Sequence, residues 1–414
     1  MRIAVIGGGI SGLGAAYLLQ RSHQVSVFEA QSHWGGHTHT HEVKADGRQF
    51  AIDTGFIVFN PNHYPLLTRL FSELGVESQE TTMSFSVSDE ASGFEYEASG
   101  FAGLLCRWQN ALSPRFWRML WDLTRFHRHA IEVLAEPAPG PALGDYLRRE
   151  GYSRGFAEDH LIPMAAALWS SPEQRIDQFP AQALVQFMQN HCMLQINDRP
   201  PWRVVKGGSA RYVDALLPQL AKVDLRLHQP VTSVERRAGQ ILVSSQGQQE
   251  SFDQVIFACH SDQALRLLSN PSSAEQEVLS ALPYQANEVL LHTDTRLLPR
   301  RRRAWAAWNA LKLRDAGDRC TVSYSMNLLQ GIETPTQFIV TLNASDRVDP
   351  SKVLRRLDYA HPQYDLAGAK ARARRAEING VDRIWYCGAY WGHGFHEDGL
   401  RSGVEVAQAL EVSW

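Results

Sequence analysis

A glycine-rich turn between a predicted strand and a predicted helix dominates the first thirty residues. The β-branched run at residues 3–6 is typical of a buried parallel strand, and it leads into the sequence GGGISG at residues 7–12. This is a complete G-x-G-x-x-G, in which Gly7 permits a tight turn, Gly9 lets the backbone approach a pyrophosphate and Gly12 lets the helix pack closely. The helix that follows directs its N-terminal amides toward that phosphate. The predicted phosphate contacts are Gly7, Gly9, Ile10, Ser11 and Gly12.

An acidic residue follows the second predicted strand at the distance expected for ribose binding. Residues 24–28 have the pattern of that strand, and Glu29 stands at its end, about 20 residues after the first glycine. A carboxylate there accepts hydrogen bonds from an adenosine ribose. A lone G-x-G-x-x-G also fits a simple glycine-rich turn, but here strand, glycines, helix, strand and acid occur in order. We therefore predict dinucleotide binding, with Glu29 and Ala30 at the adenosine end.

The composition excludes several other classes of protein. The chain has 414 residues, of which 44% are hydrophobic and 21% charged, as in ordinary globular enzymes. The formal net charge of -3 argues against a general affinity for nucleic acid. Five scattered cysteines without C-x-x-C spacing predict reduced thiols rather than a disulfide or zinc framework. The sequence shows no signal peptide and no apolar run of transmembrane length, so we expect a cytoplasmic protein and leave peripheral membrane contact open.

The predicted elements divide the chain into two interleaved lobes. Apolar strand signals at residues 254–258 and 384–388 indicate late strands that return to the N-terminal parallel sheet. The predicted α/β domain is therefore doubly wound, of Rossmann type and discontinuous, and comprises residues 1–75, 203–265 and 380–414. The predicted substrate lobe of mixed sheet comprises residues 76–202 and 266–379, with a mainly helical insert at 101–190.

Motifs at both ends and in the middle of the chain resemble one flavoprotein superfamily. They read GGGISGLGAA, VFEA, WGGHT, DTGF, KGGS and YCGAYWGHGFHEDGLRSGVEVA. Together they resemble the FAD-dependent amine oxidase and phytoene-desaturase-like superfamily. More narrowly, DTGFIVFNPNHYP, PMAAALWS, FPAQALVQFMQNH and WRVVKGGSARYV resemble a bacterial group of FAD-binding oxidoreductases. That group is similar to the oxidase-like domain that precedes plant cyclopropane fatty-acid synthases.

The resemblance implies that FAD is bound noncovalently by segments far apart in the chain. An NAD dehydrogenase needs only the N-terminal fingerprint, whereas FAD in this family also needs the C-terminal helix, so the resemblance favours FAD. His37 stands where relatives carry an arginine, and Ala389 where relatives often carry an acid. The further cofactor contacts that the resemblance implies are Gly35, Gly36, His37, Thr38, Gly55, Phe56, Val231, Gly388, Gly399 and Leu400.

Three alternating histidines follow the second glycine pair. A strand would place His37, His39 and His41 on one face, where imidazoles can ligate a metal. Alternation along one strand spreads the rings too far apart for a compact metal site without another element. A polar wall beside the cofactor and ordinary surface or core histidines are the other interpretations, and no metal is assigned.

The loop at residues 389–399 combines aromatic, imidazole and carboxylate groups. Such groups can orient a substrate and move protons while flavin performs the redox step. The competing interpretation is that the aromatic residues pack the loop and the two acids, at 397 and 398, cap the last helix. The candidate catalytic residues are Tyr390, Trp391, His393, His396 and Glu397.

The segment at residues 101–134 carries aromatic residues and arginines at helical spacing. Such a segment can rest on an anionic membrane or surround a lipid entrance. It can equally pack its aromatic face on the substrate lobe and leave the arginines in water.

These observations predict an FAD-dependent oxidoreductase that transfers hydride from a small, apolar, possibly fatty-acyl substrate to flavin. The alternatives are a flavin amine oxidase, and a non-catalytic flavoprotein that assists a lipid-modifying assembly. The sequence leaves the oligomeric state open.

Overall fold

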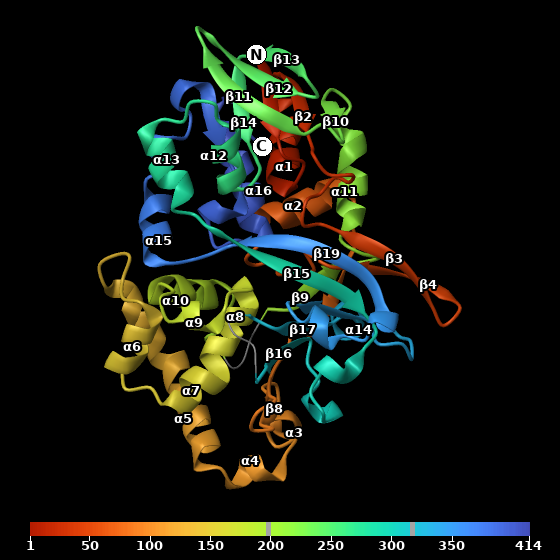
Figure 1. The fold of residues 1–414 in the computed structure, drawn as a ribbon, viewed down its shortest axis with the longest axis vertical. Coiled ribbons are helices and arrows are strands. Elements are labelled where there is room, and N and C mark those ends of the chain that lie inside the picture. Colours follow the sequence, from red (N-terminus) through yellow and green to blue (C-terminus); the bar gives the residue numbers. More distant parts are fainter. Residues whose placement is uncertain (196–199, 315–318) are drawn as a thin grey trace.

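The computed structural model describes residues 1–195, 200–314 and 319–414, and it shows two lobes (Figure 1). One lobe holds both termini and a five-stranded parallel sheet, and the other holds a seven-stranded sheet and most of the helices of the first half of the chain. This arrangement confirms the predicted fold class. The predicted domain boundaries stay a prediction, and their ranges include residues 196–199 and 315–318, which lie outside the described residues.

The parallel sheet is assembled from distant parts of the chain. Its strand order is β10-β2-β1-β14-β20, and every neighbouring pair is parallel. The strands are β1 (Arg2–Ile6), β2 (Gln24–Phe28), β10 (Asp224–Arg226), β14 (Gln254–Phe257) and β20 (Ile384–Tyr386). The late strands β14 and β20 therefore do return to the N-terminal sheet, as their apolar composition predicts.

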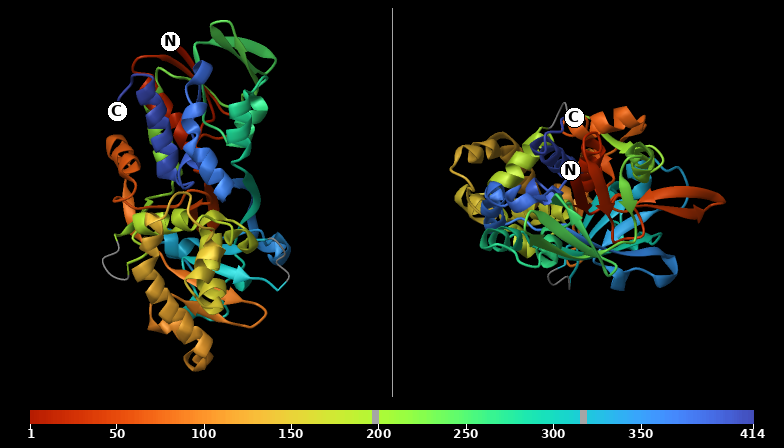
Figure 2. Two further views of the ribbon diagram at one scale, coloured as in Figure 1. Left: turned by 90° about the vertical axis from the view of Figure 1, so that its left-hand side faces the viewer. Right: turned by 90° about the horizontal axis from the view of Figure 1, so that it is seen from above.

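Side chains of this sheet alternate between two hydrophobic cores. Ile3 and Val5 pack in a core with α1 (Ile10–Leu19), α2 (Pro65–Leu74), α11 (Ala210–Leu216) and α16 (His396–Ala409). Ala4 and Ile6 pack on the other face with α12 (Ser261–Leu267), α13 (Ser273–Ser280), α15 (Leu366–Ala373) and a small antiparallel sheet. That sheet comprises β11 (Val231–Arg237), β12 (Gln240–Ser245) and β13 (Gln248–Phe252). Figure 2 shows α16 and the small sheet on opposite sides of the parallel strands.

Helices α1 and α16 pack closely because glycines lie at their contact. A Cβ atom at Gly14 would lie 2.5 Å from Leu400 Cδ1, and one at Gly403 would lie 2.4 Å from the carbonyl oxygen of Ser11. Nine of the ten residues of α1 are buried. The contact holds the start of the chain against its end.

The second lobe contains the seven-stranded sheet. Its order is β19-β15-β18-β17-β16-β7-β8, antiparallel except for the parallel pair β16 and β7. The strands are β7 (Phe85–Asp89), β8 (Glu95–Glu97), β15 (Tyr284–His292), β16 (Trp308–Lys312), β17 (Val322–Ser325), β18 (Ile339–Leu342) and β19 (Val353–Pro362). Strand β19 is not among the predicted strands, because this edge strand has no fully buried residue and so lacks apolar alternation.

Two smaller sheets join the lobes. One is the hairpin of β3 (Thr40–Ala45) and β4 (Arg48–Asp53), and the other has the order β5-β9-β6. Its strands are β5 (Val58–Phe59), β6 (Ser78–Thr81) and β9 (Trp202–Val205), and α14 (Met326–Gln330) lies beside them.

The segment from residue 101 to residue 190 is helical, and its buried side chains share one core with residues of β7, β8 and β16 (Figure 1). Its helices are α3 (Phe101–Leu104), α4 (Trp108–Leu112), α5 (Pro114–His129), α6 (Leu143–Arg149), α7 (Arg154–Phe156), α8 (Ile162–Trp169), α9 (Glu173–Ile176) and α10 (Ala181–Asn190). Phe116 and Phe126 are buried in that core, whereas Trp108, Trp117 and Trp121 are exposed. Among the described residues, no helix combines the length and the apolarity needed to cross a bilayer.

Candidate functional site

The G-x-G-x-x-G turn leaves open space at one of its three glycines. A Cβ atom at Gly12 would lie 2.0 Å from the carbonyl oxygen of Gly7, and one at Gly7 would lie 2.8 Å from the backbone of Ala258. A Cβ atom at Gly9 would meet only the carbonyl oxygen of Gly35, at 4.0 Å. Gly7 and Gly12 are thus required by the packing of the chain itself, while Gly9 borders a space that a phosphate group can approach.

The acidic residue at the end of β2 is held against this turn. Glu29 accepts hydrogen bonds from the backbone N–H of Gly8 to Oε2 and of Gln31 to Oε1, both at 2.7 Å. The carbonyl oxygen of Glu29 accepts a hydrogen bond from the N–H of Gln229, two residues before Val231. The structure therefore brings Glu29, Ala30 and the start of β11 together at one end of the turn.

The second glycine pair lies directly beside the first turn. The N–H of Gly35 donates to the carbonyl oxygen of Gly8 at 2.8 Å. A Cβ atom at Gly36 would lie 3.3 Å from Cα of Gly9, and both Gly35 and Gly36 have positive φ angles, 107° and 59°. A larger residue at either position would strain the backbone.

The DTGF segment pairs with the residues that follow the second glycine pair. The N–H of Phe56 donates to the carbonyl oxygen of His37 at 2.8 Å, and a Cβ atom at Gly55 would lie 2.0 Å from the same oxygen. The ring of Phe56 stacks on His396, with a centroid distance of 3.9 Å. This stacking connects the N-terminal segment with the start of α16.

The start of α16 meets the start of α1. A Cβ atom at Gly399 would lie 3.0 Å from Ser11 Oγ and from Ile10 Cγ2, and Leu400 packs on Gly14. Upstream, the N–H of Gly388 donates to Ser402 Oγ at 2.8 Å, so the residues after β20 are tied to the same helix. Two helix N-termini, each with a partial positive charge, converge beside Gly9.

A hydrogen-bonded chain of three side chains joins three distant segments. Tyr212 Oη lies 2.7 Å from Thr38 Oγ1 and 2.7 Å from His396 Nε2. Burial raises the pKa of Tyr212 and lowers the pKa of His396 to about 3. Tyr212 is not among the predicted site residues, because α11 gives no signal beyond ordinary amphipathic spacing.

Asp53 connects the DTGF and KGGS motifs. Its carboxylate accepts hydrogen bonds from the N–H of Ser209 at 2.8 Å, from Ser209 Oγ at 2.9 Å and from Thr40 Oγ1 at 2.6 Å. The side chain is fully buried, and this burial raises the pKa of Asp53 to about 6. The two motifs were visible in the sequence, but their contact is a product of the tertiary structure.

The alternating histidines do not act as one group, contrary to the predicted strand face. Strand β3 begins only at Thr40, and the rings of His39 and His41 lie 4.0 Å apart, with His33 stacked on His39. His37 instead faces His260, Tyr359 and His361, at centroid distances of 5.9, 5.1 and 5.5 Å. No cluster of three or more possible metal ligands occurs in the described part of the chain.

Burial keeps the group around His37 neutral. The pKa of His37 is lowered by burial, and burial lowers the pKa values of His260 and His361 to about 3. His37 Nε2 is a buried atom without a hydrogen-bond partner within the described residues. A buried polar atom of this kind calls for a partner, and a bound cofactor or substrate would supply one.

The 389–399 loop separates the candidate catalytic residues into different environments. Tyr390 is buried in the core between the parallel sheet and helices α12 and α13, and Trp391 packs against the same core. Glu397 accepts hydrogen bonds from the N–H groups of Leu66 and Leu67, at 3.0 and 2.9 Å. Glu397 therefore caps α2, and the proposed cap of the last helix comes from Asp398 alone, which accepts from the N–H groups of His393 and Phe395.

An aromatic group joins the helical insert to this loop. Trp169 Nε1 donates to the carbonyl oxygen of His393 at 2.9 Å, and the rings of Phe187 and Phe395 stack at 4.6 Å. Phe179 and Tyr364 complete the group. We refer to Trp169, Phe179, Phe187, Tyr364 and Phe395 as the aromatic wall.

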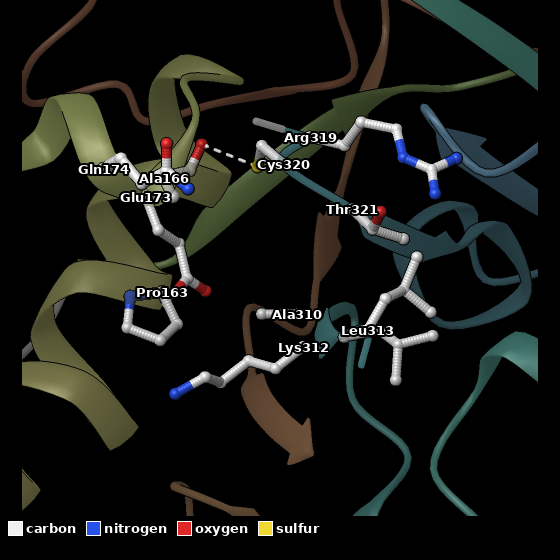
Figure 3. Close-up of a pocket in the computed structure, with 11 residues that line it drawn as sticks. Pro163, Ala166, Glu173, Gln174, Ala310, Lys312, Leu313, Arg319, Cys320 and Thr321 are labelled. Atoms are coloured by element: carbon white, nitrogen blue, oxygen red, sulfur yellow. Dashed lines mark hydrogen bonds between the residues drawn. The ribbon is translucent and has the colours of Figure 1, made fainter. Parts of the chain in front are cut away.

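A separate cavity of about 130 Å³ lies between α8, α9 and β16. Figure 3 shows Glu173, Pro163 and Lys312 directed toward it, and the hydrogen bond from Cys320 Sγ to the carbonyl oxygen of Ala166. None of the sequence-predicted site residues lines it.

These observations fit the FAD that the sequence implies. Gly9 borders open space, and two helix N-termini converge there. The residues that would hold the phosphates are Gly9 to Gly12 and Gly36, and those that would hold the ring system are Thr38, Phe56, Gly399 and Leu400.

The two glycines of the first turn should respond differently to substitution by alanine. Gly9→Ala should fold normally but weaken flavin binding by at least about tenfold, because its methyl group would occupy phosphate space. Gly12→Ala should lower the free energy of unfolding by about 1 to 3 kcal/mol, because its methyl group meets Gly7. Urea denaturation and flavin titration measure the two effects. Equal flavin affinity in Gly9→Ala and the parent protein would contradict the assignment.

Acidification should destabilise the fold through the histidines beside His37. Their pKa values in the folded state lie below the ordinary value of 6.5, so the unfolded chain binds more protons below that pH. The stabilisation is complete above pH 6.5 and is lost as the pH falls toward 3. His260→Phe preserves the stacking on Tyr284. In this variant the free energy of unfolding should fall by about 1 to 2 kcal/mol less between pH 7 and pH 5 than in the parent protein. Urea denaturation at both values tests this, and an unchanged pH dependence would contradict it.

Comparisons with known proteins agree with this architecture. A structure from an Exiguobacterium species, proposed to be a protoporphyrinogen oxidase, has a TM-score of 0.72 at 17% identity and covers 99% of this chain and 98% of its own. A conjugated-linoleic-acid-producing fatty acid isomerase from P. acnes has a TM-score of 0.71 at 15% identity. Cyclohexylamine oxidase from Brevibacterium oxydans has a TM-score of 0.69 at 15% identity. The last two cover 99% of both chains.

Comparison with protein-family profiles identifies the family in addition to the fold. A comparison with proteins of curated function gives no match. The profile of the family described as flavin containing amine oxidoreductase matches residues 10–349. Because this match spans most of the chain, the protein belongs to the flavin-containing amine oxidoreductase family and is a flavin-dependent oxidoreductase.

Proposed function

We propose that this protein oxidises an apolar, acyl-type substrate with noncovalently bound FAD. The observation that carries the proposal is the aromatic wall, which places five large rings between the helical insert and the loop before α16. Bound flavin would supply two-electron oxidation. The wall would exclude water and align an apolar chain next to the flavin.

Noncovalent binding is supported by the two cysteines nearest the glycine turn. Cys259 follows β14 and Cys387 follows β20, and burial raises the pKa of each thiol to about 12. A protonated thiol is a poor nucleophile. Neither residue is therefore suited to attack the flavin ring.

Proton transfer needs an acceptor with a free lone pair. Both carboxylate oxygens of Glu397 accept backbone hydrogen bonds, and His396 Nε2 is bonded to Tyr212. Burial lowers the pKa of His37, and its buried Nε2 has no partner within the described residues. We assign proton acceptance to His37, with His260 and His361 beside it as neutral neighbours.

Oxidation of an amine is the second candidate, because the family profile is that of amine oxidoreductases. Some flavin amine oxidases use a lysine close to the flavin to position water. In this chain, Lys44, Lys206, Lys222, Lys352 and Lys370 are exposed. Lys312 donates to the carbonyl oxygen of Glu158 in the helical insert. The structures sharing this fold include an amine oxidase and a fatty acid isomerase, so the fold does not decide between the two candidates.

Anaerobic titration of the flavoprotein should distinguish the substrates. Purified protein should show the two visible bands of oxidised flavin, and acyl chains should bleach them whereas primary amines should not. Bleaching by amines alone would establish the second candidate. Stable flavin that no acyl chain or amine reduces would indicate a non-catalytic accessory protein.

The assignment of His37 can be checked in the same titration. His37→Gln should retain flavin. The substrate should reduce this flavin at least about 100-fold more slowly than in the parent protein, because general base catalysis usually contributes a factor of this size. His41→Gln is the matched control, because His41 also has a buried, unpartnered Nε2 but lies beside His39. Equal slowing in both variants would show that loss of a neighbouring imidazole, rather than of the base, is responsible.

A further inference from the structure

One end of the molecule exposes large apolar side chains. Of the ten large hydrophobic residues that are exposed in the described part of the chain, seven lie between residues 101 and 131. Figure 1 shows α3, α4 and α5 at the end of the molecule farthest from both termini. We refer to residues 101–131 as the α3–α5 tip. Its exposed residues are Phe101, Leu105, Trp108, Leu112, Trp117, Trp121 and Ile131.

These side chains form a face distinct from the core of the insert. Helix α5 buries Phe116, Met119 and Phe126, while Trp117 and Trp121 are 49% and 52% exposed on another side of the same helix. Trp108 and Leu112 lie one helical turn apart on α4, hence on one face, and are 70% and 72% exposed. A concentration of exposed large apolar side chains of this kind marks an interaction site.

Positive charge accompanies the apolar face. Residues 101–134 contain five arginines and two acidic residues, although the whole chain has a net charge of -3. Three of these arginines form ion pairs, Arg115 with Glu158 and Asp159, and Arg118 and Arg125 with Asp122. Arg118 and Arg125 lie over the ring of Trp121, at 4.4 and 5.2 Å from its centroid. Arginine and tryptophan both prefer the boundary between lipid headgroups and acyl chains.

A second basic segment adjoins the tip. Residues 300–303 are four consecutive arginines, and the short helix Arg302–Ala304 lies against α3. A surface depression of about 870 Å³ beside it is lined in part by Arg296, Arg300, Arg302 and Trp305. Anionic headgroups match this combination of arginine and space.

We propose that the α3–α5 tip docks this protein on the surface of an anionic lipid bilayer. Charge selects this occupant over a second copy of the chain, because a twofold contact would bring two arginine-rich faces together. The proposed attachment is interfacial and requires no spanning helix, and no described helix is long and apolar enough to span a bilayer. The inference rests on the exposed surface and is independent of the substrate proposed above.

Vesicle sedimentation of the flavin-loaded protein tests the proposal. Vesicles of phosphatidylcholine mixed with phosphatidylglycerol should bind it at least about tenfold more tightly than pure phosphatidylcholine, because each interfacial arginine contributes about fivefold. The triple variant Phe101→Ser, Trp108→Ser, Leu112→Ser should lose at least about tenfold in vesicle affinity. Its flavin spectrum and free energy of unfolding should remain those of the parent, since the three side chains are exposed.

The matched control replaces equally apolar residues away from the tip. Leu328 and Val381 are 40% and 45% exposed, and the double variant Leu328→Ser, Val381→Ser should bind vesicles as the parent does. Arg128→Gln with Arg303→Gln should weaken binding at low salt but not at high salt, where exposed charges are screened. The proposal is overturned if the parent protein does not bind anionic vesicles or if the triple variant binds them as tightly as the parent. It is also overturned if the tip instead mediates a dimer that the triple variant dissociates.

Discussion

The glycine-mediated contact between α1 and α16 is the interaction on which the rest of the structure depends. These helices lie near opposite ends of the chain, and they touch because Gly14 and Gly403 carry no side chain. Their close packing brings two helix N-termini to one place, beside the open space at Gly9. A bulkier residue would separate them, and the concentration of partial positive charge that attracts a dinucleotide would be weakened.

Buried polar groups surround this contact and are paired with one another. Asp53 joins strand β4 to the KGGS turn, Glu397 caps α2, and Tyr212 bridges Thr38 and His396. Each of these bonds links residues far apart in sequence, so each fixes distant segments of the chain against one another. His37 Nε2 differs from these groups, because it is buried and unpartnered within the described residues, as are His41 Nε2 and the hydroxyl of Tyr390. That difference between satisfied and unsatisfied groups is the basis for our proposed division between structural and catalytic side chains.

The helical insert presents two chemically different faces. Its inner side joins the loop before α16 through the aromatic wall, whereas its outer tip exposes tryptophans flanked by arginines. From the sequence, packing on the substrate lobe and contact with a membrane are alternatives for this segment. The structure shows both a packed face and an exposed one, because Phe116 and Trp117 are consecutive residues on different sides of α5.

The sequence by itself determined the fold class, the glycine turn with Glu29 and the return of two late strands, because local glycine chemistry and apolar strand composition specify these directly. Family membership also followed from motifs visible in the chain. The edge strand β19, the pairing of Asp53 with Ser209 and the role of Tyr212 were decided only by the tertiary structure. Nothing local marks a long-range hydrogen bond, and an edge strand needs no buried face. Long-range contacts also separate the three alternating histidines. His37 precedes the first paired residue of β3, and its ring neighbours, His260 and Tyr359, come from distant parts of the chain.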